Sequence, residues 1–294
     1  MPIAHLRNTD IFYETFGDAA DQHVLLIAGL GGQLLVWETE FCRRLADTGT
    51  RVIRFDNRDV GLSTMFDDAE LDLSMALSEA LAGRAIEVPY TLSDMAGDAL
   101  GLMDHLGIER AHLVGVSMGG MIAQTLAAEH PDRVASLTSI MSSTGSRMVG
   151  QATPAAIAVL FERPPTDRDG AIDASMQAQR VIGSPAYFDT EAARAHAGAA
   201  YDRSFNPEGS GRQLAAIYAA GNRSDQVAAI STPTLVIHGA QDPLVDISGG
   251  RHTAEIIPGA ELLIIDDMGH DLPRPLWDKL IEAISAHVRT ASTP

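Results

Sequence analysis

The chain has 294 residues, 46% of them hydrophobic, which is enough apolar material for one large α/β domain that carries an insertion. Its 21 basic and 39 acidic residues give a net charge of −18, which disfavours binding to nucleic acid and to anionic membranes. The single lysine, Lys279, leaves almost no candidate for Schiff-base chemistry, and the single cysteine, Cys42, excludes an intramolecular disulfide and a cysteine-based zinc site.

The first residues, 1–7, lack an apolar segment of the length that a signal peptide needs. No later apolar run approaches the length of a membrane span. We therefore expect a cytoplasmic protein without a membrane partner, and the sequence leaves its oligomeric state open.

The N-terminal part predicts a hairpin followed by a β-α-β unit. Residues 3–6 and 11–17 are the two strands of the hairpin. Residues 23–28 form a continuous apolar run, which is typical of a strand buried on both faces of a parallel sheet. A helix is expected over 41–48, with Cys42 facing the core, and a further strand over 51–56.

A glycine-rich loop, residues 29–32, follows the first buried strand. Such a loop lets the backbone approach a ligand closely, although it could also be a flexible connector. A phosphate-binding loop is disfavoured, because the glycine spacing fits neither the dinucleotide-binding nor the Walker pattern.

The next segments are a polar turn and two helices. Asp56 and Arg58 border the turn, and we expect them to fix it by charge-assisted hydrogen bonds rather than to act in catalysis. Residues 67–89 are acidic and helix-prone and are a candidate border of a pocket. Residues 91–106 predict an amphipathic helix, capped by Thr91, Ser93 or Asp94 and ended by Gly107.

The segment around Ser117 organises the rest of the chain. Residues 111–116 predict a buried strand, and a helix of small residues runs from Met118 to Pro131. Residues 115–119 read Gly-Val-Ser-Met-Gly, the G-x-S-x-G pattern of a nucleophile elbow, in which the serine occupies a strained strand-to-helix corner. A plain tight turn is the alternative, but the strand before the pattern and the helix after it favour the elbow.

After a strand at 134–141 the regular succession of strands stops. Residues 142–225 are alanine-rich and helix-prone, and we expect them to form a helical cap inserted into a core made of residues 1–141 and 226–294. Some apolar side chains of the cap are candidates to line a pocket, although they could equally pack between its helices: Met148, Phe161, Met176, Tyr187, Phe188, Tyr201 and Tyr218.

Strands return at 233–239 and 261–266, with a helix expected over 249–257 and another from Pro273 onward. Asp242 follows the first of these strands and His270 follows the second. Because carboxyl ends of parallel strands meet at one edge of a sheet, both side chains are expected beside Ser117.

A serine hydroxyl needs a base, and the base needs an acid that fixes its tautomer. We expect His270 to be the base, because its rival His238 lies inside a buried strand. Among the acids, Asp242 is favoured over its competitors: Asp246 lies deeper in the next segment, and three others are too near His270 in sequence, Asp266, Asp267 and Asp271.

Five motifs carry a resemblance that covers nearly the whole chain: residues 28–30, 56–63, 115–120, 238–243 and 269–273. They resemble the α/β-hydrolase superfamily and are similar in particular to a bacterial esterase group that includes aclacinomycin methylesterase. The resemblance implies an α/β fold with a mostly parallel, eight-stranded sheet, flanking helices and an inserted helical cap.

The resemblance also implies a nucleophile at Ser117, an acid at Asp242 and a base at His270. The oxyanion hole would consist of the N–H groups of Leu30 and Met118. The chain departs from the family pattern at Ala28, where histidine often precedes the first glycine. The cap need not match any one member, so the substrate does not follow from the resemblance.

The expected function is hydrolysis of a small-molecule carboxylic ester through an acyl-enzyme, with no metal or organic cofactor. The same triad could act as a lactonase, an amidase or lactamase, a hydrolase of carbon–carbon bonds or a cofactor-free perhydrolase. Epoxide and haloalkane hydrolysis are disfavoured, because they need a carboxylate at position 117. A non-catalytic binder of small molecules is the alternative outside enzymes.

Overall fold

The computed structural model describes residues 2–18 and 22–292. In these residues eight strands form one sheet in the order β1-β2-β4-β3-β5-β6-β7-β8. The strands β1 and β2 are antiparallel to their neighbours, and all others run parallel, as predicted. Their bounds are β1 (Ile3–His5), β2 (Asp10–Phe16), β3 (His23–Ile27), β4 (Arg51–Phe55), β5 (Ala111–Val116), β6 (Val134–Ile140), β7 (Thr234–Gly239) and β8 (Glu261–Ile265).

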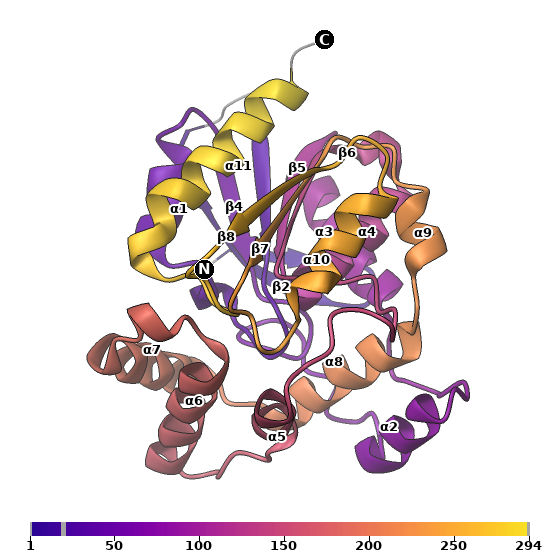
Figure 1. Cartoon of the computed structure of the whole chain (residues 1–294), viewed down its shortest axis with the longest axis vertical. Helices are drawn as coiled ribbons and strands as arrows, with labels where there is room; N and C mark the ends of the chain where they lie inside the picture. The colour runs from indigo at the N-terminus through magenta and orange to yellow at the C-terminus, as the bar shows by residue number, and fades with distance from the viewer. Residues whose placement is uncertain (1, 19–21, 293–294) are drawn as a thin grey trace.

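Helices cover both faces of the sheet. Successive residues of a strand point to opposite faces, so an apolar run such as β3 needs a core on each side. Val24 and Leu26 pack under α1 (Thr39–Ala46) and α11 (Trp277–Ala291), whereas Leu25 and Ile27 pack under α3 (Leu92–His105) and α4 (Met118–Glu129). Figure 1 shows the two layers, and on the second face the short α9 (Ser224–Ala228) contacts both α4 and α10 (Ile247–Ile256).

The predicted start and end of α3 illustrate how local signals fix an element. Of the three candidate caps, Thr91 takes the position: its hydroxyl accepts from Asp94 N–H, and the Asp94 carboxylate accepts from Thr91 N–H in return. The chain leaves the helix through Gly107, which has a positive φ of 68°.

A helical insert separates β6 from β7. It contains α5 (Pro154–Phe161), α6 (Arg168–Ile182), α7 (Thr190–Arg203) and α8 (Pro207–Ala220). Pro154 and Pro207 are the first residues of their helices, where a missing N–H does no harm. Each of these two prolines therefore begins a helix.

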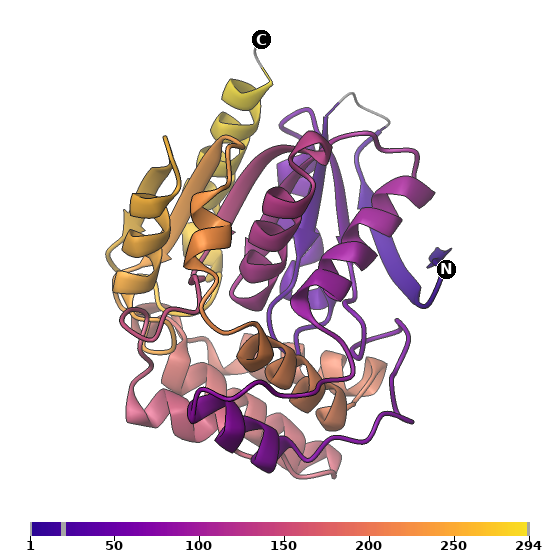
Figure 2. The ribbon, with the colours of Figure 1, turned by 90° about the vertical axis from the view of Figure 1, so that its right-hand side faces the viewer.

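The insert gathers at one end of the sheet together with α2 (Leu73–Leu81), as two perpendicular views show (Figures 1 and 2). This is the end at which the parallel strands terminate, because Gly31 beyond β3 bonds to α8 and His270 beyond β8 bonds to the end of α6. Of the helices within residues 2–18 and 22–292, none has the length and apolar character needed to cross a membrane.

Candidate active site

Ser117 occupies the strained corner that the sequence predicts. It lies between β5 and α4 with φ 53° and ψ −120°, a backbone conformation that a residue with a side chain rarely adopts. A Cβ atom on Gly115 would lie 2.2 Å from the Gly119 carbonyl oxygen, and one on Gly119 would lie 2.2 Å from the Ile27 carbonyl oxygen. Both glycines are therefore required by steric contact, as expected for an elbow.

Two backbone amides flank this serine. Met118 is the first residue of α4, so its N–H has no acceptor within the helix. This N–H lies at the N-terminus of α4, where the helix dipole is positive. On the other side, Gly29 packs against Ser117, because a Cβ built on Gly29 would lie 3.3 Å from Ser117 Cβ. The peptide that carries the Leu30 N–H therefore begins next to Ser117.

The structure brings His270 and Asp242 together. His270 Nδ1 lies 2.7 Å from Asp242 Oδ2, and the carboxylate is fully buried. Its other oxygen, Oδ1, accepts from the N–H groups of Leu244 at 2.9 Å and Val245 at 2.8 Å. These two bonds fix the carboxylate plane, so that Oδ2 faces the imidazole.

His238, the rival base, is a structural residue in this geometry. Its side chain is fully buried in β7, and its Nε2 lies 2.8 Å from the Val245 carbonyl oxygen. Burial lowers the pKa of its imidazole, so the ring is kept neutral. A neutral Nε2 that donates to a carbonyl cannot also accept a proton from a serine.

Three of the acids that compete with Asp242 have other partners, and the fourth, Asp266, is exposed. Asp246 caps α10 through Ser248 N–H, and Asp267 accepts a hydrogen bond from the Tyr187 hydroxyl. Asp271 accepts from the Ser184 hydroxyl and from Ser184 N–H at 3.0 Å. Burial raises the pKa of Asp271, although these bonds oppose the change.

The loop that carries His270 is held by the helical insert, a contact that the sequence does not reveal. His270 N–H donates to the Ile182 carbonyl at the end of α6, and Gly269 N–H donates to Ser184 Oγ, both at 2.8 Å. Ser184 is almost completely buried. No local pattern marks Ser184, because a serine before a proline is typical of any loop.

The polar turn after β4 is also tied to the insert. Asp56 Oδ1 accepts from Leu34 N–H at 2.7 Å, and its Oδ2 pairs with Arg203 of α7 at 2.7 Å. Arg58 forms a bidentate pair with Asp98 of α3, at 2.6 and 2.8 Å. Asp56 and Arg58 thus make charge-assisted hydrogen bonds, each with a distant partner rather than with the other.

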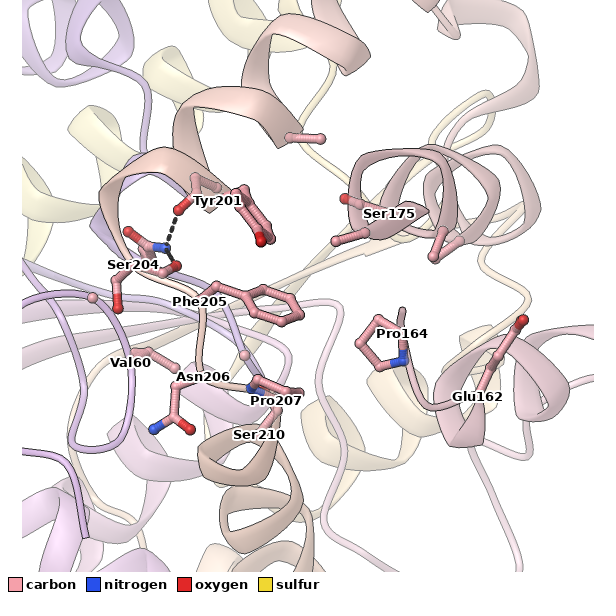
Figure 3. A pocket seen from close by; sticks show the side chains of 18 of the residues that line it. Val60, Glu162, Pro164, Ser175, Tyr201, Ser204, Phe205, Asn206, Pro207 and Ser210 are labelled. Atoms are coloured by element: carbon pink, nitrogen blue, oxygen red, sulfur yellow. Dashed lines mark hydrogen bonds between the residues drawn. The ribbon is translucent and has the colours of Figure 1, made fainter. Parts of the chain in front are cut away.

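A cavity of about 280 Å³ lies between α5, α6, α7 and the start of α8. It reaches Gly31 of the glycine-rich loop and the turn residues Val60 and Gly61. Figure 3 shows the rings of Tyr201 and Phe205 pointing into it, opposite Pro164. The lining is mostly small and apolar, so the space suits an uncharged organic group.

Of the apolar side chains that the sequence proposed for a pocket, Tyr201 lines this cavity. Met176 and Phe188 instead pack together in the small core between α6 and α7. The segment 67–89 does not contribute to the lining, and its helix α2 packs on α8 instead.

Ser117 and His270 are not joined by a hydrogen bond within the described residues. Hydrogen bonds between a nucleophile and its base often become short only when substrate is bound. The structure thus places the strained serine, the Gly29 peptide and the His270–Asp242 pair at the carboxyl edge of the sheet.

One class of hydrolytic enzymes is defined by a strained serine at a strand-to-helix corner of a parallel sheet, with a histidine–aspartate pair in the loops after later strands. The chain belongs to the alpha/beta hydrolase fold family, whose profile matches residues 22–273. It is accordingly a hydrolase, and the predicted fold class is confirmed.

Named relatives match nine tenths of the chain or more. Rhodomycin D methylesterase DauP of Streptomyces sp. (strain C5) is 29% identical over 99% of this chain and 100% of its own length. The 3-oxoadipate enol-lactonase 2 of Acinetobacter baylyi is 25% identical over 90% of this chain and 91% of its own. The predicted resemblance to a bacterial methylesterase group is confirmed by the first of these.

Among solved structures, the enol-lactonase from Burkholderia xenovorans LB400 superimposes with a TM-score of 0.75 and 26% identity. The match covers 98% of this chain and 100% of that one. The likeness therefore includes the helical insert as well as the sheet.

Proposed function

We propose that this hydrolase cleaves small-molecule carboxylic esters through an acyl-enzyme on Ser117. The observation that carries the proposal is the His270–Asp242 pair at 2.7 Å, held in one orientation by two backbone amides, at the same sheet edge as the strained serine. The name of the methylesterase relative supports an ester as the substrate class.

In the proposed reaction His270 Nε2 takes the proton from the Ser117 hydroxyl as its oxygen attacks the ester carbonyl. Asp242 holds the proton on Nδ1 and stabilises the imidazolium that forms. The N–H groups of Leu30 and Met118 donate to the oxyanion. His270 then protonates the leaving alcohol, and water repeats the sequence on the acyl-enzyme.

We further propose that residues 142–225 are a cap domain and that the cavity beside Tyr201 receives part of the substrate. Two features support this: the insert lies at the carboxyl edge of the sheet, and the cavity reaches Gly31 in the loop beside Ser117. Neither the acyl group nor the alcohol of the ester is specified.

The test uses purified protein and a panel of p-nitrophenyl esters graded by acyl length. Wild type is expected to hydrolyse at least one of them, and Ser117→Ala is expected to fold with the same circular dichroism spectrum and to lose turnover. Labelling of Ser117 by a fluorophosphonate separates an enzyme from a non-catalytic binder, because a binder without an activated serine does not react. Turnover that survives in Ser117→Ala contradicts the proposal.

A lactone is the second candidate substrate, favoured by the likeness to two enol-lactonases. A lactone is an ester within a ring, so the same acyl-enzyme would form and the alcohol would stay attached. Release of acid from a panel of lactones, measured with a pH indicator, compares the two substrate classes on one enzyme preparation.

A further inference from the structure

The glycine-rich loop closes a tight turn directly beside Ser117. Gly32 N–H donates to the Gly29 carbonyl at 3.1 Å, and Gly31 has a φ of +65°. Leu30 has no positive φ, and a four-residue turn with a positive φ at its third residue but not at its second is a type II turn. Leu30, the proposed oxyanion donor, is its second residue, and the Leu30 N–H shares a peptide unit with the Gly29 carbonyl.

Turns of types I and II differ by a flip of the central peptide, here the one between Leu30 and Gly31. The closing bond from Gly32 to Gly29 is compatible with both, and glycine at position 31 can adopt either conformation. The flip turns the Gly31 N–H and leaves the peptide of the Leu30 N–H in place within the turn. A turn with two accessible forms is not fixed relative to Ser117, however, and the Leu30 N–H moves with the turn as a whole. A contact to the Gly31 N–H selects one form and ties the turn to the element that makes the contact.

Gln213 of α8 makes that contact. Its Oε1 accepts from Gly31 N–H at 2.8 Å, and its Nε2 donates to the Arg58 carbonyl at 2.7 Å. The side chain is completely buried. Exchanging the oxygen and the nitrogen would set the amide group against the Gly31 N–H, so the two bonds together fix the orientation of this glutamine.

The position of α8 is itself fixed by its neighbour Arg212. Arg212 forms two hydrogen bonds of 2.8 Å to the Asp59 carboxylate, and both side chains are buried. Asn206, at the start of α8, donates to the Asp59 carbonyl at 3.2 Å. Gln213 therefore approaches the turn from a helix that is anchored on the core.

We propose that Gln213 is a positioning residue for ester hydrolysis: its side-chain oxygen holds the turn 29–32 in the type II form and ties it to α8, which keeps the Leu30 N–H at the place where the oxyanion forms. The inference rests on the proposed function. It makes the insert part of the catalytic apparatus, because a residue of α8 sets the geometry of a donor in the core.

The first variant is Gln213→Leu, which keeps the approximate volume and removes the acceptor. An oxyanion donor acts only within a narrow geometry, so kcat is expected to fall about 10- to 100-fold with KM changed by less than about threefold. The matched control is Gln124→Leu, which removes another completely buried glutamine that bridges core elements and lies outside the turn. Gln124→Leu is expected to lower Tm with kcat within about twofold of wild type.

The second variant, Gln213→Glu, decides the matter even if the leucine variant does not fold. A protonated glutamic acid reproduces both bonds, with its carbonyl accepting from Gly31 and its hydroxyl donating to Arg58, whereas a carboxylate cannot donate. Burial raises the pKa of a carboxyl. The ratio of kcat for Gln213→Glu to kcat for wild type is therefore expected to rise as the pH falls from about 8 to about 6.

The outcomes separate the two proposals. Wild type that cleaves no ester, or Ser117→Ala that still cleaves them, overturns the proposed function and this inference with it. If Ser117→Ala is inactive but a folded Gln213→Leu keeps kcat within about twofold of wild type, only the role of Gln213 is wrong. A ratio of kcat for Gln213→Glu to kcat for wild type that does not change with pH likewise shows that only the role of Gln213 is wrong.

Discussion

The replacement Asp242→Asn tests the proposed triad at its best-defined contact. Asp242 Oδ1 accepts from two backbone N–H groups, so the asparagine oxygen must take this position. The reverse orientation would set the amide group against both donors, at a cost of about 2–6 kcal/mol. The asparagine nitrogen therefore replaces Oδ2 and donates to His270 Nδ1.

An imidazole that accepts at Nδ1 carries its proton on Nε2 and cannot take the proton of Ser117. The same tautomer error in a serine protease triad lowers kcat about 10⁴-fold, equivalent to about 5.5 kcal/mol of barrier. We expect a loss of this order for Asp242→Asn with p-nitrophenyl acetate at saturation, with Tm within a few degrees of wild type.

Asp246→Asn is the matched control, because Asp246 follows the same strand and only caps α10. Asparagine caps helices as well as aspartate does, so kcat is expected to stay within about threefold of wild type. If Asp242→Asn keeps more than a tenth of the wild-type kcat, or if the control loses as much, the assignment of the acid is refuted.

Two further predictions concern stability. Gly119→Ala sets a Cβ 2.2 Å from the Ile27 carbonyl oxygen and should destabilise the fold by about 3 kcal/mol or more. The control Gly97→Ala lies in open space within α3 and should stabilise the fold by about 0.5–1 kcal/mol. Urea unfolding measures both free energies, and equal effects would contradict the steric argument. Arg212→Met leaves Asp59 buried without its cation and should cost about 3–5 kcal/mol at pH 7. Burial by itself raises the pKa of Asp59, but bonds from Arg212, Phe66 N–H and Tyr90 outweigh it and leave that pKa below its ordinary value. The pairing therefore stabilises the fold above the ordinary pKa and its contribution is lost as the pH falls, so thermal unfolding of Arg212→Met and wild type should converge in acid; a difference that grows in acid would refute the sign.

Sequence determined the parts of this protein that depend on neighbours along the chain. Apolar runs such as residues 23–28 predict strands buried on both faces, because each face needs its own core. Thr91 and Asp94 mark a helix start, since the bonds that cap it span three residues. Ser117 could be found because the glycines on either side of it are dictated by contacts across the corner itself.

The pairing of Asp242 with His270 was also within reach of the sequence, because parallel strands deliver their following loops to one edge. The pocket-lining residues could not be identified from the sequence. Of the apolar candidates, Tyr201 lines the cavity, whereas Met176 packs in the small core between α6 and α7. Helical periodicity gives the face of a helix but not the neighbour that it packs against.

Tertiary structure alone decided the contacts between the helical insert and the loops of the core. Gln213 and Gly31 lie 182 residues apart, and Ser184 and Asp271 lie 87 residues apart. A glutamine on an alanine-rich helix, or a serine before a proline, has the same local pattern whether it faces water or a backbone amide. Hydrogen bonds of this kind form only once packing has excluded water from both partners, and packing is a property of the folded chain rather than of any segment in it.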